Sequence, residues 1–547
     1  MSRPWFTCLI VSAFGGLSGA AAAEAPRSAG PAIELPPMMV EETVASAPWL
    51  HTSAGGAEFL SRCSSSTTRD FVSAWVAKMQ LVRVLVPEEF LARTDAPTLI
   101  VLYSQGLEQT VSAEIQRELQ SDQKRDGDRV NIAPNMRLAD RDMHASIVYI
   151  DETQFSGAGL SISPGHVHFM LRGRVPELPA WLLDGVVSVW QGADFVLDPI
   201  TLRPFPGATD PARPRALLPA AELFAGAAAR AGENRHPRHL EARHATQEIF
   251  FRWAAVSGPA TRAAFWKVAA LSAEGPVTEE AFEGVFGFDF AELRDRLSDY
   301  LPKAAGETAF IRPGTLPPLP DFELERATPG QVARIRGEWE RLAIGHVKRR
   351  LPQVAEPYIA QARRTLRRAY DAGDRDPRLL ATMGLCEIDA GNDAGARPYL
   401  EPAVAGGVAR PRAYHELARL RFAELRRDAP ESKLFPFAEI APVLQPLQRG
   451  ITQSPPLPES FQLLAEAWAR CEISPTANEF AELRLGTRLF PRRPPVAHAV
   501  AVVLARHGHH AEATAVLDAC AGHSADDATE AAIARLRVEL SRSPASR

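Results

Sequence analysis

Apolar residues in the first part of the chain follow two different spacings. In TTRDFVSAWVAKMQLVRVLV (67–86) they recur every three or four positions, which predicts an amphipathic helix. The shorter runs PTLIVLYS (97–104) and ASIVYID (145–151) are rich in strand-forming residues and predict buried strands. The apolar residues of the predicted helix are Phe71, Trp75, Met79, Val82 and Leu85. This part of the chain is therefore expected to mix helices with strands.

From about residue 190 the spacing becomes almost wholly helical. ATQEIFFRWAAV (245–256) and ATRAAFWKVAALSA (260–273) are amphipathic, and residues 278–301 predict two helices joined near Gly287. A proline-rich segment follows at 310–330. Because proline cannot continue a helix and stiffens a linker, we place a domain boundary in residues 306–330. Whether the two domains pack together or swing on this segment is left open by the sequence.

Small residues recur beyond this boundary at intervals typical of paired helices. Gly384 and Ala418 lie 34 residues apart, and Ala465 and Ala501 are separated by about one such period. A small residue, a glycine turn and a second small residue allow two helices to pack closely. The pattern resembles tetratricopeptide repeats, whose period is about 34 residues.

This resemblance covers roughly residues 355–520, with a longer insertion near 427–458. It implies an all-α, TPR-like solenoid over residues 331–547. Such solenoids present a concave groove that binds peptide segments or protein partners. An unrelated helical bundle is the alternative fold for this region.

The first 23 residues have the layout of a secretory signal. Arg3 precedes the apolar run WFTCLIVSAFGGL (5–17), and small residues lead to an expected cleavage near Ala23. A membrane anchor is the alternative, but the run is shorter than the ~20 residues that span a bilayer. Residues 24–47 are expected to form a flexible leader. The sequence thus predicts an exported protein, periplasmic or extracellular, with no transmembrane segment after signal cleavage.

Charge and cysteine usage narrow the possible partners. The chain carries 61 Lys and Arg against 66 Asp and Glu, for a net charge of -5. The two signs are interspersed, which excludes nucleic acid as the main partner and predicts a solvated mixed-charge surface. Cys8 leaves with the signal. The remaining cysteines form no CxxC pair and are expected to be isolated buried thiols, with one disulfide as the alternative. They are Cys63, Cys386, Cys471 and Cys520.

The stretch SPGHVHFMLRGRVPELPAWLLDGVVSVW (163–190) contains the candidate chemistry. In zinc peptidases, H-E-x-x-H places two histidines on one helix face, and its glutamate takes a proton from metal-bound water. Here HFMLR (168–172), PAWLLDG (179–185) and the later step G-x-x-x-x-E-L (287–293) resemble the gluzincin family called peptidase MA-like. The resemblance covers residues 48–305 and implies an α+β domain of gluzincin-like fold.

The family motif also shows what this chain lacks. By the resemblance, His168 would be the second histidine and Asp184 the third ligand. Pro164 stands where the first histidine is expected, and Gly165 stands where the catalytic glutamate is expected. The resemblance therefore implies that no catalytic residue is present. Ser163 is a good N-cap and Pro164 suits the first helical position, so a helix can begin here instead.

His166, His168 and Asp184 are the remaining candidates for a metal site. On a helix, histidines two positions apart point in nearly opposite directions and cannot share an ion, whereas on an extended segment they could. We therefore expect no metal and no other cofactor, with zinc on these three residues as the alternative. No GxSxG elbow, phosphate loop or GxGxxG pattern occurs elsewhere.

Together these patterns predict an exported protein with a gluzincin-like α+β domain followed by a TPR-like solenoid. The expected function is binding of a protein or peptide through the cleft and the repeats, without catalysis. Two alternatives stay open. One is a zinc metallopeptidase with a non-standard ligand set, and the other is a structural or assembly protein of the cell envelope.

Overall fold

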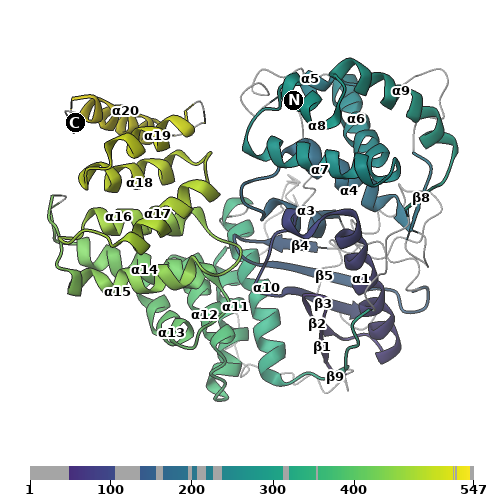
Figure 1. The fold of residues 1–547 in the computed structure, drawn as a ribbon. Helices are drawn as coiled ribbons and strands as arrows, with labels where there is room; N and C mark the ends of the chain where they lie inside the picture. Colours follow the sequence, from purple (N-terminus) through teal and green to yellow (C-terminus); the bar gives the residue numbers. More distant parts are fainter. Residues whose placement is uncertain are drawn as a thin grey trace, which may run out of the picture.

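The structure is a computed structural model of the 547-residue chain. It describes residues 48–104, 136–155, 164–194, 200–205, 217–225, 237–311, 319–350, 352, 355–430, 432–521, 523 and 526–542. The predicted signal (1–23) and leader (24–47) lie outside the described residues. An α/β region built on a mixed sheet is followed by a long run of helices, α10 to α20, which we call the repeat region (Figure 1).

The main sheet has the strand order β4-β5-β3-β2-β1-β9. Strands β2, β3 and β5 are parallel, whereas β4, β1 and β9 pair antiparallel with their neighbours. The strands are β1 (Leu50–Ala54), β2 (Ala57–Ser61), β3 (Thr98–Ser104), β4 (Met136–Ala139), β5 (His144–Ile150) and β9 (Glu325–Arg326). The predicted strands at 97–104 and 145–151 are confirmed as β3 and β5.

Helix α1 (Ser65–Leu85) covers one face of this sheet (Figure 1). It begins after Ser64, whose side chain accepts a hydrogen bond from the backbone N–H of Thr67 and so caps the helix. All five apolar residues that predicted this helix are buried. They join one core with apolar residues of β2, β3, β5 and the helices that follow.

Those helices and a small second sheet, ordered β6-β7-β8, complete the α/β region. Its helices are η1 (Glu88–Phe90), α3 (Pro164–Arg172), α4 (Ala180–Gln191), α5 (Ala220–Leu223), α6 (Pro237–Val256), α7 (Pro259–Glu274), α8 (Glu279–Phe286) and α9 (Phe290–Gly306). The second sheet contains β6 (Ala193–Asp194), β7 (Ile200–Leu202) and β8 (Ala309–Ile311). The predicted joint lies at Gly287, which adopts φ 78° between α8 and α9.

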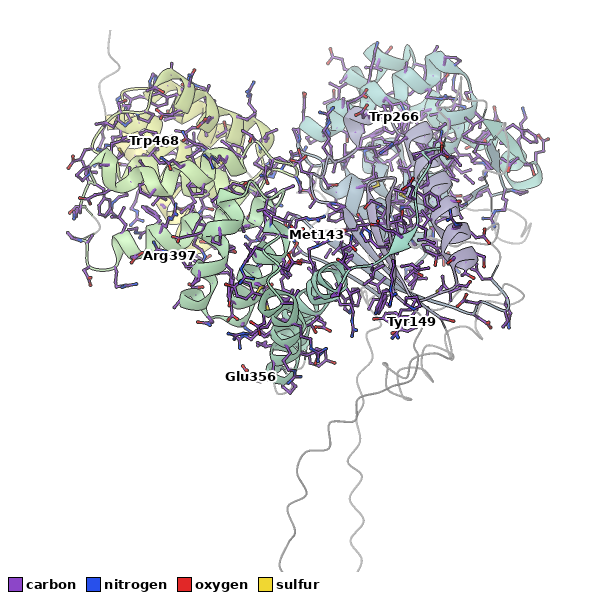
Figure 2. The ribbon with its side chains drawn as sticks, turned by 90° about the horizontal axis from the view of Figure 1, so that it is seen from below. Met143, Tyr149, Trp266, Glu356, Arg397 and Trp468 are labelled. Carbon is purple, nitrogen blue, oxygen red and sulfur yellow. The ribbon has the colours of Figure 1, made fainter. Side chains whose placement is uncertain are left out.

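Helix α10 (Pro329–Arg350) covers the other face of the main sheet. Its Ile335 and Leu342 are buried against Val101, Ile147 and other side chains of that face. Met143 belongs to the same cluster and lies where the two regions meet (Figure 2). The first helix of the repeat region is thus an integral layer of the α/β region.

Both ends of the proline-rich segment are accordingly held in sheets. At its start β8 pairs with β7, and at its end β9 pairs with β1. The sequence left the relation of the two regions open. In the structure, the α/β region and the repeat region pack directly against each other.

The repeat region is a succession of antiparallel helix pairs. Its helices are α10, α11 (Ala355–Asp371), α12 (Pro377–Ala390), α13 (Asp393–Ala405), α14 (Pro411–Arg426), α15 (Phe437–Gly450), α16 (Pro458–Ala469), α17 (Ala477–Leu489), α18 (Pro494–Arg506), α19 (His510–Ala519) and α20 (Asp527–Arg542). The long insertion predicted near 427–458 contains α15. The arrangement is that of a TPR-like helical solenoid (Figure 1).

Small residues allow the helices of these pairs to pack closely, as the repeat pattern predicted. A Cβ atom on Gly384 of α12 would lie 2.6 Å from the side chain of Leu400 on α13. Gly486 of α17 similarly touches Phe461 of α16. Gly391, between α12 and α13, adopts φ 87°, a backbone conformation that favours glycine. The glycines therefore stand where neighbouring helices approach most closely or turn back.

Two further predictions concern cysteines and membranes. Cys63, Cys386, Cys471 and Cys520 are buried and form no disulfide, which confirms the prediction of isolated thiols. Within the part of the chain that the structure describes, no helix combines the length and apolar character needed to cross a bilayer.

Candidate functional site

The stretch that resembles a zinc peptidase forms helices α3 and α4. Helix α3 begins at Pro164, with Gly165 next, as the sequence predicted. The predicted cap, Ser163, lies outside the described residues. The two positions where the family motif has its first histidine and its glutamate therefore form the first turn of a helix.

The candidate metal ligands are divided between these two helices. His166 is buried, and its ring centroid lies 4.7 Å from that of Trp75 on α1. His168 on α3 and Asp184 on α4 are each half-buried. Among the described residues, no three His, Cys, Asp or Glu side chains gather closely enough to hold a metal ion. The three candidates thus form no ligand set.

His144, the first residue of β5, is a neighbour of this site that sequence reasoning missed. Its side chain is buried, and its ring centroid lies 5.2 Å from those of His166 and Phe169. The residue lies one position before the predicted strand 145–151. The strand pattern therefore gave its approximate place, but nothing in the sequence linked it to α3.

The turn between β2 and α1 is rich in hydroxyl groups and contains the Cys63 thiol. Burial and the negative charge of Glu152 raise the pKa of the Cys63 thiol to about 12, so it stays protonated at neutral pH. The Glu152 carboxylate itself accepts a hydrogen bond of 2.9 Å from the backbone N–H of Ser64. The hydroxyls of Ser61 and Thr68 bond to each other at 2.8 Å. The polar groups of Ser61, Ser64, Thr68 and Glu152 are therefore hydrogen-bonded to one another near the start of α1.

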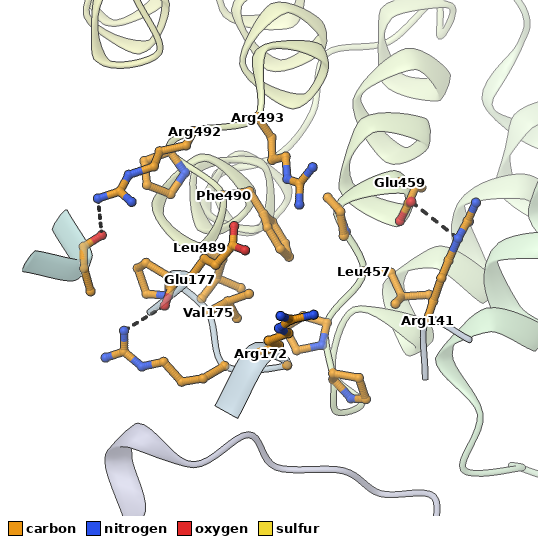
Figure 3. Close-up of a pocket in the computed structure, with 18 residues that line it drawn as sticks. Arg141, Arg172, Val175, Glu177, Leu457, Glu459, Leu489, Phe490, Arg492 and Arg493 are labelled. Atoms are coloured by element: carbon orange, nitrogen blue, oxygen red, sulfur yellow. Dashed lines mark hydrogen bonds and ion pairs between the residues drawn. The ribbon is translucent and has the colours of Figure 1, made fainter. Parts of the chain in front are cut away.

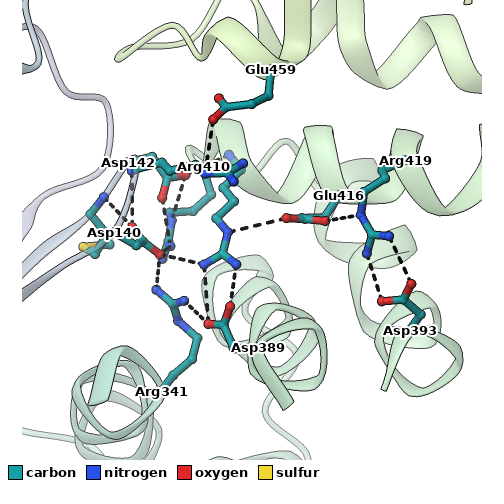
Figure 4. A network of polar contacts seen from close by, with 12 residues as sticks. Asp140, Asp142, Arg341, Asp389, Asp393, Arg410, Glu416, Arg419 and Glu459 are labelled. Atoms are coloured by element: carbon teal, nitrogen blue, oxygen red, sulfur yellow. Dashed lines mark hydrogen bonds and ion pairs between the residues drawn. The ribbon is translucent and has the colours of Figure 1, made fainter. Parts of the chain in front are cut away.

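A buried ion network joins the α/β region to the repeat region (Figure 4). Its members come from the turn between β4 and β5 and from helices α10, α12 and α14 or the residue before α14. We use the name buried ion network for Asp140, Asp142, Glu338, Arg341, Asp389, Arg410 and Arg412. Several of these side chains lie wholly away from solvent, so their charges depend on one another.

Arg341 of α10 is the centre of this network. It is 0% exposed and donates hydrogen bonds to Glu338 at 2.6 Å, Asp140 at 2.5 Å and Asp389 at 2.6 Å. Arg410 donates to Asp142 at 3.1 Å. Charge-assisted bonds of this kind are stronger than neutral ones, and inside a protein little water screens them.

The network changes the acidity of its members. Burial raises the pKa of Glu338, but the positive charges of Arg341 and Arg410 outweigh it and lower that pKa to about 2. The same balance between burial and arginine charges holds the pKa of Asp140 far below its usual range. Both carboxylates are therefore ionised at neutral pH.

A second polar contact ties α10 to the far edge of the same sheet. Glu58 of β2 accepts a hydrogen bond from His51 of β1 at 3.0 Å, and it forms an ion pair with Arg334 of α10. Burial raises the pKa of Glu58, but the hydrogen bond from His51 and the charge of Arg334 lower it to about 2. Helix α10 thus forms ion pairs with residues of the sheet region on both sides of its apolar contact: Arg341 with Asp140, and Arg334 with Glu58.

These contacts correct one prediction. Sequence reasoning assigned the interspersed charges to a solvated surface, which is wrong for Glu58, Glu338, Arg341 and Arg410, all of them buried. The reason is physical: partners come from segments far apart in the chain, and pairing offsets the cost of removing each charge from water.

A pocket opens where the two regions meet again, on the side of α3. We call it the junction pocket; its volume is about 260 Å³. Figure 3 shows that the α3–α4 loop, the loop before α16 and the loop between α17 and α18 enclose it. Its lining combines prolines and other apolar residues with five arginines and two glutamates. These charged residues are Arg141, Arg172, Arg174, Arg492, Arg493, Glu177 and Glu459.

Direct contacts fix the walls of the junction pocket. Arg492 donates a hydrogen bond of 2.8 Å to the backbone carbonyl of Ala273 on α7. Asp95 and Ser454 bond to each other twice, at 2.8 Å each, through both backbone N–H groups. Val175 packs against the apolar core of the later repeats. The pocket is therefore a shared feature of both regions.

The chain was compared with known proteins and structures. No protein-family model matches it, and no curated protein matches it. Two similar solved structures are Pseudomonas aeruginosa PilF (14% identity, 39% of this chain, 95% of that chain, TM-score 0.24) and the RpL4 assembly chaperone Acl4, residues 1–338 (17% identity, 37% of this chain, 84% of that chain, TM-score 0.24). At a TM-score of 0.24, neither structure informs the function of this chain.

Proposed function

We propose that this protein is a binding scaffold that holds a peptide segment of a partner protein and does not cleave it. The observation that carries the proposal is the junction pocket, whose walls come from both the α/β region and the repeat region. Helical repeats supply extended surfaces for peptide segments and protein partners.

The start of α3 supports a function without catalysis. In a zinc peptidase a glutamate next to the first histidine takes the proton from metal-bound water. Pro164 and Gly165 stand at those positions in this chain, and neither residue has a side-chain group that could bind a metal or accept a proton. Loss of a general base alone typically lowers a rate about 10²–10⁴-fold. The gluzincin-like fold and the inactive site remain part of the proposal.

The proposal includes export. Residues 1–23 would be removed as a secretory signal, and the protein would act in the periplasm or outside the cell. N-terminal sequencing of the mature protein tests this part directly. A mature chain beginning near residue 24 supports it, and an intact Met1 on the folded protein would contradict it.

The zinc peptidase alternative requires His166, His168 and Asp184 to bind an ion together. Elemental analysis after dialysis against a mild chelator decides it. We expect far less than one zinc per chain. Near-stoichiometric zinc, lost on replacing His168 by alanine, would instead favour the peptidase.

The main experiment selects peptides from a random displayed library on the purified full-length protein. We expect reproducible enrichment of related peptides and no hydrolysis of those peptides, with or without a chelator. Hydrolysis that a chelator abolishes would refute the proposal, and so would a failure to enrich any peptide. The full chain is needed, because deletion of residues 331–547 would leave bare the sheet face that α10 covers.

If the protein is instead a structural component of the cell envelope, the repeats would matter and the junction pocket would not. Pocket variants that lose peptide binding but keep every activity of the protein in cells would favour that alternative. Variants that lose both would favour the scaffold.

A further inference from the structure

We propose that the junction pocket recognises an acidic peptide segment in which apolar residues or prolines alternate with carboxylates. This inference rests on the proposed function and names the chemistry of its partner. Its basis is the pairing state of the charged residues in the pocket, the apolar wall between them and the rigidity of the loops.

Three of the five arginines are already engaged. Arg141 lies 3.5 Å from the carboxylate of Glu459. Arg174 donates a hydrogen bond of 2.8 Å to the backbone carbonyl of Pro176. Arg492 donates to Ala273, as described above. These three side chains help to build the walls.

Arg172 and Arg493 differ from the other three. Both are exposed, and neither side chain forms an ion pair or hydrogen bond with any residue that the structure describes. Arg172 ends α3, and Arg493 precedes α18, a 13-residue helix with no acidic residue in its first turn. The positive end of the α18 dipole adds to the charge of Arg493. The pocket therefore presents two available guanidinium groups on opposite walls.

An apolar surface separates these two arginines. In the view of Figure 3, the ring of Phe490 lies between the side chains of Arg172 and Arg493. Leu457, Leu489 and Val175 continue this surface. A segment with carboxylates on either side of an apolar residue matches this order, because a guanidinium binds a carboxylate through paired hydrogen bonds.

The loops around the pocket are stiffened by proline, which fixes the φ angle of each such residue. A wall that is ordered before binding loses less entropy when a ligand is held. The prolines that line the pocket are Pro176, Pro455, Pro456, Pro458 and Pro491. The pocket thus suits an extended segment that enters without rearranging it.

Nucleic acid fits this pocket less well than an acidic peptide. Binding a phosphate backbone requires a row of cations, whereas the pocket offers two available arginines beside Glu177 and Glu459. The protein also carries a net charge of -5. Glu177 is exposed and lines the same pocket, so it should oppose an acidic ligand and its charge can be reversed as a test.

The experiment measures binding of three fluorescein-labelled probes to the full-length protein at low and physiological salt. The probes are a dodecapeptide of alternating glutamate and proline, a dodecapeptide of alternating lysine and proline, and a single-stranded oligonucleotide. Fluorescence anisotropy gives each Kd. We expect the glutamate peptide to bind most tightly and to weaken as salt rises.

Two variants and a control locate the site. The double variant Arg172→Glu/Arg493→Glu should weaken binding of the glutamate peptide at least about tenfold, and Glu177→Lys should tighten it several-fold. Arg69→Glu/Arg83→Glu makes the same charge change at two exposed positions on α1 outside the pocket, and it should leave the Kd within about twofold. All of these side chains are exposed, so we expect the variants to fold, as circular dichroism would verify.

The outcomes separate this inference from the proposed function. Equal binding by the double variant and the wild-type protein, or tighter binding of the lysine peptide or the oligonucleotide, would overturn the inference. If the displayed library still selects peptides, the scaffold function survives that result. If no peptide of any kind binds, both proposals fail.

Discussion

Replacement of Arg341 by methionine tests how the two regions are held together. The side chain is 0% exposed and donates hydrogen bonds to three carboxylates at 2.5–2.6 Å. Methionine has a similar length but no charge, so the change leaves Glu338, Asp140 and Asp389 with only Arg410 and Arg412 to balance them. We expect Arg341→Met to lower the free energy of unfolding substantially.

The magnitude follows from burial. Removing one partner of a buried ion pair costs about 3–5 kcal/mol, because the remaining charge stays out of water without compensation. A matched change at the surface provides the control. Arg397 contacts Glu401 at 2.8 Å and Glu424 at 2.6 Å, but its side chain is 44% exposed. Arg397→Met should therefore cost less than about 1 kcal/mol.

Urea unfolding followed by tryptophan fluorescence and far-ultraviolet circular dichroism measures both changes. The unfolding curves from the two probes should coincide for the wild-type protein. They should separate for Arg341→Met, because this variant weakens the contact between the two regions. If Arg341→Met costs no more than Arg397→Met, the reasoning from charge burial is refuted.

A double variant makes the interpretation stricter. Asp140 is one of the carboxylates that Arg341→Met leaves uncompensated. Adding Asp140→Asn to Arg341→Met should therefore recover part of the lost stability, whereas Asp140→Asn alone should be destabilising. Additive losses would mean that the two side chains do not interact in the folded protein.

Three further predictions can be checked on the same purified protein. The pKa of Glu58 is lowered from 4.5 to about 2, so its ionised form stabilises the folded protein by an amount on the order of 3 kcal/mol. This contribution is present above the unfolded pKa of Glu58 and is lost as pH falls toward 2. Glu58→Gln should therefore flatten the dependence of the unfolding free energy on pH between 5 and 2.5, and an unchanged slope would contradict this. A Cβ on Gly185 would lie 2.5 Å from the carbonyl oxygen of Gln247, so Gly185→Ala should destabilise the protein by about 1–3 kcal/mol. The exposed helical Gly284 has no atom within 4 Å of such a Cβ, so Gly284→Ala should leave the stability unchanged or raise it by up to about 1 kcal/mol. Equal effects of the two variants on the melting temperature would show that the close approach of α4 and α6 does not limit the stability. Treatment with a strong chelator should leave the melting temperature unchanged, and a fall of several degrees would reveal a structural metal.

Local patterns in the sequence predicted the elements well because their physical causes are local. The helix at 67–86 was predicted from apolar residues at helical spacing, and these residues are the buried ones of α1. The repeat pattern singled out Gly384, which lies against Leu400 where α12 meets α13. In each case the spacing along the chain directly reports one face of one element.

The same reasoning could not find contacts made between distant segments. Nothing in the sequence around Arg341 and Arg410 distinguishes a buried arginine from a solvated one. Their partners Asp140 and Asp142 lie about 200–270 residues earlier. The motif glycine Gly185 was quoted as part of a family pattern, whereas the structure gives it a packing reason against α6.

The candidate site was harder to predict than the fold for a related reason. Sequence reasoning placed Pro164 and Gly165 correctly at the start of a helix, and the structure shows His166 buried and His168 half-buried on that helix. It left the binding site unassigned. The junction pocket combines loops from four parts of the chain, and prolines in those loops gave no sign that they would meet.

The turn between β4 and β5 connects the pocket to the ions that hold the regions together. Asp140 and Asp142 enter the buried ion network (Figure 4), and Arg141 between them pairs with Glu459 at the pocket wall (Figure 3). Successive side chains of one short turn thus contribute to both the buried ion network and the wall of the junction pocket. Because the pocket has no complete wall without both regions, the buried charges that dock them also set its shape. The cost of burying those charges is therefore linked to binding as well as to stability.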